Sequence, residues 1–351
     1  MEPDDFQPTN SSEVPHDVPA TEVHSSTERA MHACAVVIYI VTCVLGMSGN
    51  GLVIWATGFK LKRTAYTVWL QSLAVADFTV SLLLPLYITD IALDFHWPFG
   101  WLICKLSYGA VVLCLHANVF TLAAISVDRC FSVVLPVWSQ NHRSPRLATL
   151  LSLGMWVAAA IGSAPSCVFR QLISRDDHMW CFTEYLLEGE GMALNTTDRG
   201  EDDDRAVPEQ AKSLHDARYR TLTLTSFLIG FLLPFLVITA SYTIIVLRLR
   251  RDRLVSSGSK AFRIVAAIIL AFLVCWAPYH IVSILALLLH PHDEDWPMAL
   301  MVGVPFSRGL ACINSCINPF LYLFMWQDFR DLLKKSFQRV DNQGEAMQTH
   351  L

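Results

Sequence analysis

An aspartate and several asparagines interrupt stretches of sequence that are otherwise strongly apolar. Asp77 has apolar neighbours on both sides, and a carboxylate in such a setting needs hydrogen-bond partners. Amide and hydroxyl side chains from other apolar stretches could form with it a cavity that holds water or a sodium ion. A static polar network is the alternative. The residues expected to meet there are Asp77, Asn50, Asn118, Asn314, Ser315 and Asn318.

A second ionisable pair, Asp128-Arg129, closes an apolar stretch that begins near Cys104. As a helix, the intervening residues would extend roughly 37 Å at about 1.5 Å per residue, which is enough to cross a membrane. Cys104 and Arg129 are therefore expected at opposite ends of one helix. The arginine is either a functional group at the inner mouth or a plain interfacial anchor, and the residues alone leave both open.

Seven apolar stretches are long enough to hold these groups inside a membrane. Hydrophobic residues make up 53% of the chain and charged residues 16%, which is less charge than a soluble domain carries. The sequence predicts an all-α membrane protein, a seven-transmembrane helix bundle over 33–325. A tail over 1–32 precedes it and a short segment over 326–351 follows. The expected spans are 33–58, 65–92, 101–134, 147–169, 217–249, 259–289 and 297–325.

The distribution of charge predicts the orientation. One alternating set of loops holds 16 of the 26 basic residues but only 6 of the 31 acidic ones, and basic loops face the cytoplasm. The N-terminus is therefore expected outside. Asn10 and Asn195 lie in glycosylation sequons, and both fall on the predicted outer side. Cys104 lies at the outer start of the third span and Cys181 in the long outer loop between the fourth and fifth, and on that side an oxidised state is expected rather than two free thiols.

Prolines interrupt five of the expected spans, at Pro85, Pro165, Pro234, Pro278 and Pro319. Each removes a backbone hydrogen bond and bends its helix. The pattern indicates a bundle able to pivot, and simple packing geometry is the alternative reading.

These features together resemble the rhodopsin-like G-protein-coupled receptors over residues 33–340. Motifs of that family occur in the family's order, which is far more specific than any single motif. The resemblance also implies a short amphipathic eighth helix from Gln327. The motifs are Gly49-Asn50-Gly51-Leu52-Val53, Leu73-Ala74-Val75-Ala76-Asp77, Asp128-Arg129-Cys130, Trp156, Pro234 with Tyr242, Phe272 with Cys275-Trp276-Ala277-Pro278-Tyr279, and Asn318-Pro319-Phe320-Leu321-Tyr322.

Within that family the chain is similar to the chemoattractant receptors, the group of the formyl-peptide, chemerin and complement anaphylatoxin receptors. Chemerin receptors are the nearest of these. The stretches that carry the similarity are 95–100, 135–143, 163–170, 314–319 and 327–330.

The resemblance implies roles for individual residues. Cys104 would pair with Cys181, Arg129 would contact the G protein, and Trp276 would couple ligand position to the bend at Pro278. The residues assigned to activation are Asp128, Arg129, Tyr242, Phe272, Trp276, Pro278, Asn318, Pro319 and Tyr322. Those assigned to a sodium cavity are Asp77, Asn118, Asn314 and Asn318, and no other metal or cofactor is implied.

The expected ligand pocket departs from the group's pattern. Chemoattractant receptors often carry a basic residue in span five, and Ser226 stands at that position here. Arg308 could replace it by pairing with a ligand carboxylate. The alternatives are an internal pair with Asp90 or Asp94, or an extended side chain that reaches the outer interface. His116 is either a ligand contact or a satisfied core histidine. The candidate pocket residues are Tyr87, Asp90, His116, Ser226, Tyr279 and Arg308.

The expected function is a plasma-membrane receptor for a chemoattractant-type ligand, a peptide or a small protein such as chemerin. Coupling to inhibitory G proteins in leukocyte chemotaxis or inflammation is implied, with arrestin as a further partner. The alternative is an atypical or lipid-mediator-binding receptor that captures ligand with little G-protein signalling. A transporter is disfavoured because no repeat relates two halves of the chain, and an enzyme because no nucleophile or metal constellation occurs.

Overall fold

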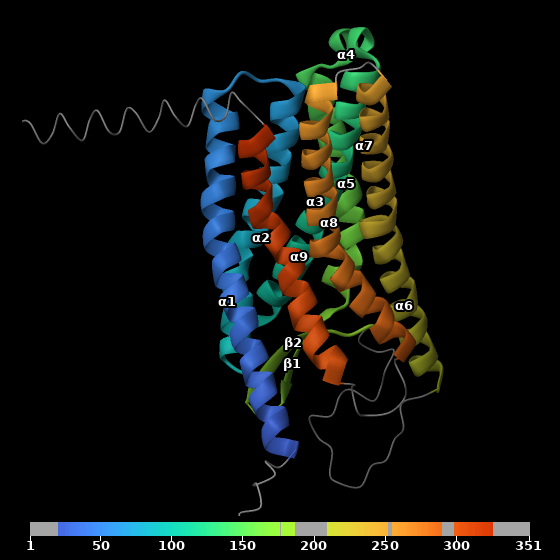
Figure 1. The fold of residues 1–351 in the computed structure, drawn as a ribbon. Coiled ribbons are helices and arrows are strands. Elements are labelled where there is room, and N and C mark those ends of the chain that lie inside the picture. The colour runs from blue at the N-terminus through green and yellow to red at the C-terminus, as the bar shows by residue number, and fades with distance from the viewer. Residues whose placement is uncertain (1–19, 176, 187–208, 252–254, 290–297, 326–351) are drawn as a thin grey trace, which may run out of the picture.

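The computed structural model describes residues 20–175, 177–186, 209–251, 255–289 and 298–325 (Figure 1). Helices lie at all seven predicted spans. Within the described residues, six helical segments are long and apolar enough to cross a membrane, and α9 adds a seventh helix of 28 residues. The helices are α1 Ala20–Trp55, α2 Ala65–Ala92, α3 Gly100–Val134, α5 Pro145–Val168, α6 Glu209–Phe227, α7 Leu233–Arg251, α8 Val255–Leu289 and α9 Met298–Met325.

Two helices begin earlier than the apolar pattern predicts. The first starts at Ala20 rather than near residue 33, and the fifth span starts at Glu209 rather than near 217. Hydropathy marks only the part of a helix that lies in lipid, whereas backbone hydrogen bonds continue the helix into water.

Local sequence fixes several helix ends and bends. The Thr64 side chain accepts from the backbone of Thr67 at 3.2 Å and caps α2, and Ser144 does the same for α5. The fifth span is one rod of α6 and α7, joined by the π-helical turn η2 Leu228–Leu232. Pro234 lies two residues after this turn and cannot donate a backbone hydrogen bond, which is consistent with the altered winding there.

Three short elements were not predicted from the sequence. The helix α4 Pro136–His142 lies at one end of the bundle, and the antiparallel hairpin of β1 Arg170–Arg175 and β2 His178–Thr183 lies at the other (Figure 1). The hairpin is tied to the loop between α2 and α3, because the Trp97 backbone donates to Met179 at 2.8 Å.

The helices surround a core that contains polar as well as apolar side chains. α3 contacts α2, α5 and α7, while α9 contacts α1, α2 and α8. On α5 the large apolar side chains face outward at helical spacing, and this face suits lipid: Leu150, Leu153, Val157 and Ile161 are all exposed. Asp77, Asn50, Asn118, Asn318 and Ser315 are instead fully buried between the helices.

Candidate functional site

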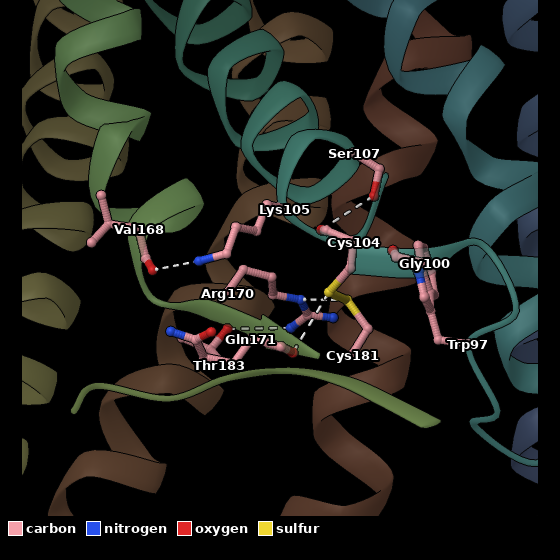
Figure 2. The surroundings of a disulfide bond; sticks show 10 residues. All are labelled: Trp97, Gly100, Cys104, Lys105, Ser107, Val168, Arg170, Gln171, Cys181 and Thr183. Carbon is pink, nitrogen blue, oxygen red and sulfur yellow. Dashed lines mark hydrogen bonds between the residues drawn. A yellow bond between two sulfur atoms is a disulfide. The ribbon is translucent and has the colours of Figure 1, made fainter. Parts of the chain in front are cut away.

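The hairpin is fastened to α3 by a disulfide between Cys104 and Cys181, with their Cα atoms 5.8 Å apart (Figure 2). The pairing implied by the resemblance is therefore present in the structure. A second contact holds the same corner, since the Lys105 ammonium donates to the Val168 carbonyl at 3.2 Å. Together these links place the hairpin across the end of the bundle.

Arg170, the first residue of β1, is held in a fixed position beside the disulfide (Figure 2). Its guanidinium lies 4.5 Å from the ring centre of Tyr108 and donates to the Thr183 hydroxyl at 3.2 Å. Burial lowers the pKa of the Arg170 guanidinium, while nearby tyrosines and Asp90 oppose this shift. The guanidinium therefore lies against the Tyr108 side chain of α3.

Arg308 lies on α9 inside a ring of tyrosines. Its side chain is exposed in the described structure. Tyr185 and Tyr219 approach it from the loop after β2 and from α6. The tyrosines within electrostatic range of Arg308 are Tyr39, Tyr87, Tyr108, Tyr185, Tyr219 and Tyr279.

The internal ion pair considered for Arg308 does not form within the described residues. Asp90 lies within electrostatic range of Arg170 and His96, and Asp94 is exposed on a left-handed turn at φ 53°. Neither carboxylate forms a hydrogen bond or ion pair with Arg308 in the described part of the chain. The ligand contact and the extended side chain that reaches the outer interface both stay predictions.

His116 and Ser226 lie deeper and close to each other. A Cβ placed on Gly230 would stand 3.5 Å from the His116 Nε2 atom and 3.9 Å from the Ser226 hydroxyl. The other ring nitrogen of His116 lies 2.8 Å from the Val112 carbonyl of its own helix, which makes it the donor. Nε2 is therefore left as an acceptor beside a glycine and a serine.

An aromatic column connects this level to the middle of α8. Phe231 and Phe272 are stacked at 5.7 Å, and Phe272 and Trp276 at 6.2 Å. Trp276 is stacked in turn on His280 at 6.4 Å. Pro278 lies inside α8 between the last two, at the point where the helix cannot make its regular backbone hydrogen bond.

Sequence reasoning missed His280 and four of the six tyrosines. His280 is buried, and its Nε2 atom has no hydrogen-bond partner in the described structure. It could have been found by the criterion that selected His116, an ionisable residue within an apolar span. Tyr39, Tyr108, Tyr185 and Tyr219 come from four separate segments, and no local pattern marks them as neighbours.

The polar residues expected around Asp77 do meet. The Asn318 amide donates to Asp77 Oδ2 at 2.7 Å, and the Asn118 amide donates to Oδ1. Asn314 donates to Asn118 Oδ1 at 3.3 Å, while Asn50 donates to the Ser315 carbonyl at 2.8 Å. Close approach of α1 to α9 requires Gly49, where a Cβ would stand 2.9 Å from Pro319.

At the inner end, Arg143 rather than Arg129 pairs with Asp128. Two nitrogens of Arg143 donate to the two carboxylate oxygens at 2.8 and 2.6 Å. The Arg129 guanidinium instead lies 3.9 Å from the ring centre of Tyr66 on α2. Tyr242 is buried on α7 within electrostatic range of Arg129.

Several expected features lie outside the described residues. They are the two sequons at Asn10 and Asn195, the amphipathic helix from Gln327 and the inner segment over 326–351. The backbone of Tyr322 belongs to α9, but its side chain is not described.

Comparison with known proteins explains this arrangement. The family model "7 transmembrane receptor (rhodopsin family)" matches residues 49–197 and 204–322. The chain belongs to this family. The receptor is 42% identical to human chemerin-like receptor 1 over 308 residues, which cover 88% of this chain and 79% of the relative. It is 36% identical to a rainbow-trout (Oncorhynchus mykiss) C3a anaphylatoxin chemotactic receptor over 91% of this chain and 81% of that protein. Human chemerin-like receptor 2 is 33% identical, with 88% and 81% covered.

The matches establish a class A receptor of the chemoattractant type and not an enzyme. The seven-helix fold expected from the sequence is confirmed. As a member of this class, the receptor is a multi-pass membrane protein that binds an extracellular ligand and acts on G proteins.

Proposed function

We propose that this receptor lies in the plasma membrane with its N-terminus outside, responds to a chemoattractant peptide or small protein, and couples to inhibitory G proteins. The 42% identity to human chemerin-like receptor 1 across the bundle carries the proposal, because the relative's name points to chemerin as the ligand. A role in leukocyte chemotaxis or inflammation follows from the same likeness, and arrestin is a further partner.

The residues provide a route from ligand to G protein. A ligand that contacts the tyrosines around Arg308 would reach Tyr279, which neighbours the column of His280, Trp276 and Phe272. Displacement of Trp276 would change the bend at Pro278 and move the inner half of α8. Opening there would free Arg129 to meet the G protein. An agonist acts by binding the open arrangement more tightly than the closed one.

The buried groups around the Asp77 carboxylate would suit a sodium ion. A bound ion would favour the arrangement in which the inner ends of the helices are closed. Hard cations prefer oxygen ligands, and carboxylate, hydroxyl and amide oxygens are concentrated here. The Ser315 hydroxyl and Asn50 Oδ1 are buried without hydrogen-bond partners in the described structure. Asp77, Ser315 and Asn118 would hold the ion, and the amides of Asn314 and Asn318 would orient these groups. The ion would neutralise a buried charge to which, in the described structure, the amides of Asn118 and Asn318 donate.

The proposal is tested by exposing cells that express the receptor to chemerin, with an inhibitory G-protein sensor as the readout. A dose-dependent response at nanomolar to micromolar chemerin is expected. Surface binding of chemerin without a sensor response would favour a capture receptor. A response to a lipid mediator but not to chemerin would refute the assigned ligand class.

A further inference from the structure

The hairpin has a histidine contact on each of two sides, and a proton acts on the two contacts in opposite directions. On one side His96, in the loop between α2 and α3, contacts β2. On the other side His215 of α6 lies against Glu184, the residue that follows β2. Histidine is the side chain that ordinarily changes charge between about pH 5 and 8. Its charge therefore decides how the hairpin is held on each side.

His96 holds the hairpin only while its ring is neutral. Its Nδ1 atom accepts a hydrogen bond from the Met179 backbone N–H at 3.3 Å. An imidazolium ring has two N–H donors and no acceptor, so a protonated His96 cannot make this bond. The backbone bond from Trp97 to Met179 and the disulfide do not titrate, so the hairpin stays attached when the His96 contact is lost.

A second histidine on the same side makes protonation less favourable. The rings of His96 and His178 meet edge to face, with 4.9 Å between their centres and 75° between their planes. The His178 ring also lies 4.5 Å from the Trp180 ring, and its Nε2 atom is buried without a hydrogen-bond partner in the described structure. Two charged rings at this distance repel each other, and a buried N–H without an acceptor is costly. Acid therefore weakens the packing of β2 on the loop.

The loop that carries His96 is strained. Asp94 and Phe95, the two residues before it, have φ values of 53° and 63°, in the left-handed region that residues other than glycine rarely adopt. Such a backbone persists only where its surroundings hold it. Loss of the contact between His96 and the hairpin removes part of that support, so the loop can relax away from β2.

Asp90 offers a protonated His96 another partner. This carboxylate on α2 lies within electrostatic range of His96, and its Oδ1 atom is buried without a hydrogen-bond partner in the described structure. Arg170 lies within range of the same carboxylate and offsets part of its attraction. The charged or titratable groups on the elements around His96 are His32, Asp90, Asp94, Arg170, Asp177 and His178.

His215 responds to a proton in the opposite direction. Its Nδ1 atom lies 3.4 Å from Asp216 Oδ1, and its Nε2 atom lies 3.8 Å from Glu184 Oε1. A neutral ring has one N–H and can serve one of these carboxylates, whereas an imidazolium can pair with both. Glu184 is held in place, because its Oε1 atom accepts from the Leu186 backbone at 3.1 Å. The other charged groups nearby, about one turn away along α6, are Lys212 and Arg218.

We propose that the hairpin is a proton-sensitive cover at the outer end of the bundle. Acid weakens its contact with the loop between α2 and α3 through His96 and strengthens its contact with α6 through His215. In the proposed orientation both histidines face the extracellular medium, so the cover responds to acidification outside the cell. The inference rests on that orientation and on neither the ligand nor the G-protein class of the proposed function.

The test uses purified full-length receptor in nanodiscs, where both ends of the bundle meet the buffer. Hydrogen–deuterium exchange of segments 170–183 and 209–219 is compared at about pH 7.5 and about pH 5.5, after correction for the intrinsic pH dependence of exchange. His96→Asn keeps an acceptor at the Nδ1 position that does not titrate, and His215→Gln removes the titrating ring on the other side. His142→Asn is the matched control, because this exposed histidine lies on α4 at the opposite end of the bundle.

On acidification we expect exchange of segment 170–183 in the wild type to rise by about fivefold, as for the loss of one hydrogen bond. Exchange of segment 209–219 should fall. His96→Asn should match the wild type near neutral pH and lose most of the rise in 170–183. His215→Gln should lose the fall in 209–219 and keep the rise in 170–183, while His142→Asn should behave as the wild type.

Equal corrected exchange of 170–183 at the two pH values would overturn the proposal, as would a full acid response in His96→Asn. A wild type in which only one of the two segments responds would overturn the opposed action of the two histidines. Unfolding temperatures near neutral pH show whether each variant is folded. If His96→Asn is not, His178→Phe keeps the ring contact without the charge, and an undiminished rise there would equally overturn the proposal. A hairpin that responds to acid in a receptor that is silent to chemerin would keep this inference and refute the proposed function.

Discussion

Arg143 and Asp128 form a two-point ion pair across the inner end of α3, with nitrogen–oxygen distances of 2.8 and 2.6 Å. Arg129, the neighbour of Asp128, is thereby left to stack on Tyr66 at 3.9 Å. The short helix α4 ends just before Arg143 and sets the position of that residue. The loop after α3 therefore holds the carboxylate that would otherwise pair with the adjacent arginine.

A double-mutant cycle on this pair should show a coupling of about 1 kcal/mol, because the pair is charge-assisted and only partly exposed. Thermal unfolding of Asp128→Asn, Arg143→Gln and the double variant measures it. Arg146→Gln serves as the control, since this residue is exposed three positions further on. Purely additive losses would show that the pair contributes nothing to stability.

The close contact between α3 and α5 at Gly109 predicts that a second substitution can restore the stability that a first one removes. A Cβ at Gly109 would overlap the Cys167 sulfur but would stand 3.4 Å from the Cys167 Cβ atom. Gly109→Ala should therefore destabilise the receptor by about 1–3 kcal/mol through overpacking. The double variant Gly109→Ala/Cys167→Ala should recover most of that loss, because the sulfur is gone.

Surface expression and thermal unfolding report this result. The matched control is Gly154→Ala on α5, where a Cβ meets nothing within 4 Å and should be neutral or slightly stabilising. A double variant as unstable as Gly109→Ala alone would contradict the packing described here.

If the groups around Asp77 bind sodium, the unfolding temperature of the receptor should depend on the sodium concentration. Replacement of potassium by sodium at constant ionic strength should raise the unfolding temperature of the wild type, since a ligand that binds only the folded protein stabilises it. Asp77→Asn keeps the shape but removes the charge, so it should abolish the difference between the two salts. Equal unfolding temperatures of the wild type in both salts would refute the sodium site and leave a static polar network.

The helical spans and the polar core could be predicted because both follow from local composition. Twenty apolar residues must form a helix in lipid, and Asp77 can find partners only on neighbouring helices. The inner pair could not be predicted, because Asp128 has two arginines within reach and the choice of Arg143 depends on where α4 ends. The amino-acid sequence does not mark that position.

The group of tyrosines around Arg308 could not be predicted from the sequence either. Arg308 stands out in the sequence as a charge in an apolar span, and the structure surrounds it with tyrosines that the sequence does not mark. Tyr39, Tyr108 and Tyr219 become its neighbours only when α1, α3 and α6 are packed together. The hairpin that brings in Arg170 was missed because its strands are short and lie in a loop.

The most direct test of the account measures G-protein activation by the wild type and by Arg129→Ala at equal surface expression. Sensors for each G-protein class are read before and after addition of chemerin. The account predicts that the inhibitory-class sensor responds in the wild type and that Arg129→Ala reduces the response to background while chemerin still binds. An equal response in Arg129→Ala, or chemerin bound to the wild type with every sensor silent, would contradict it.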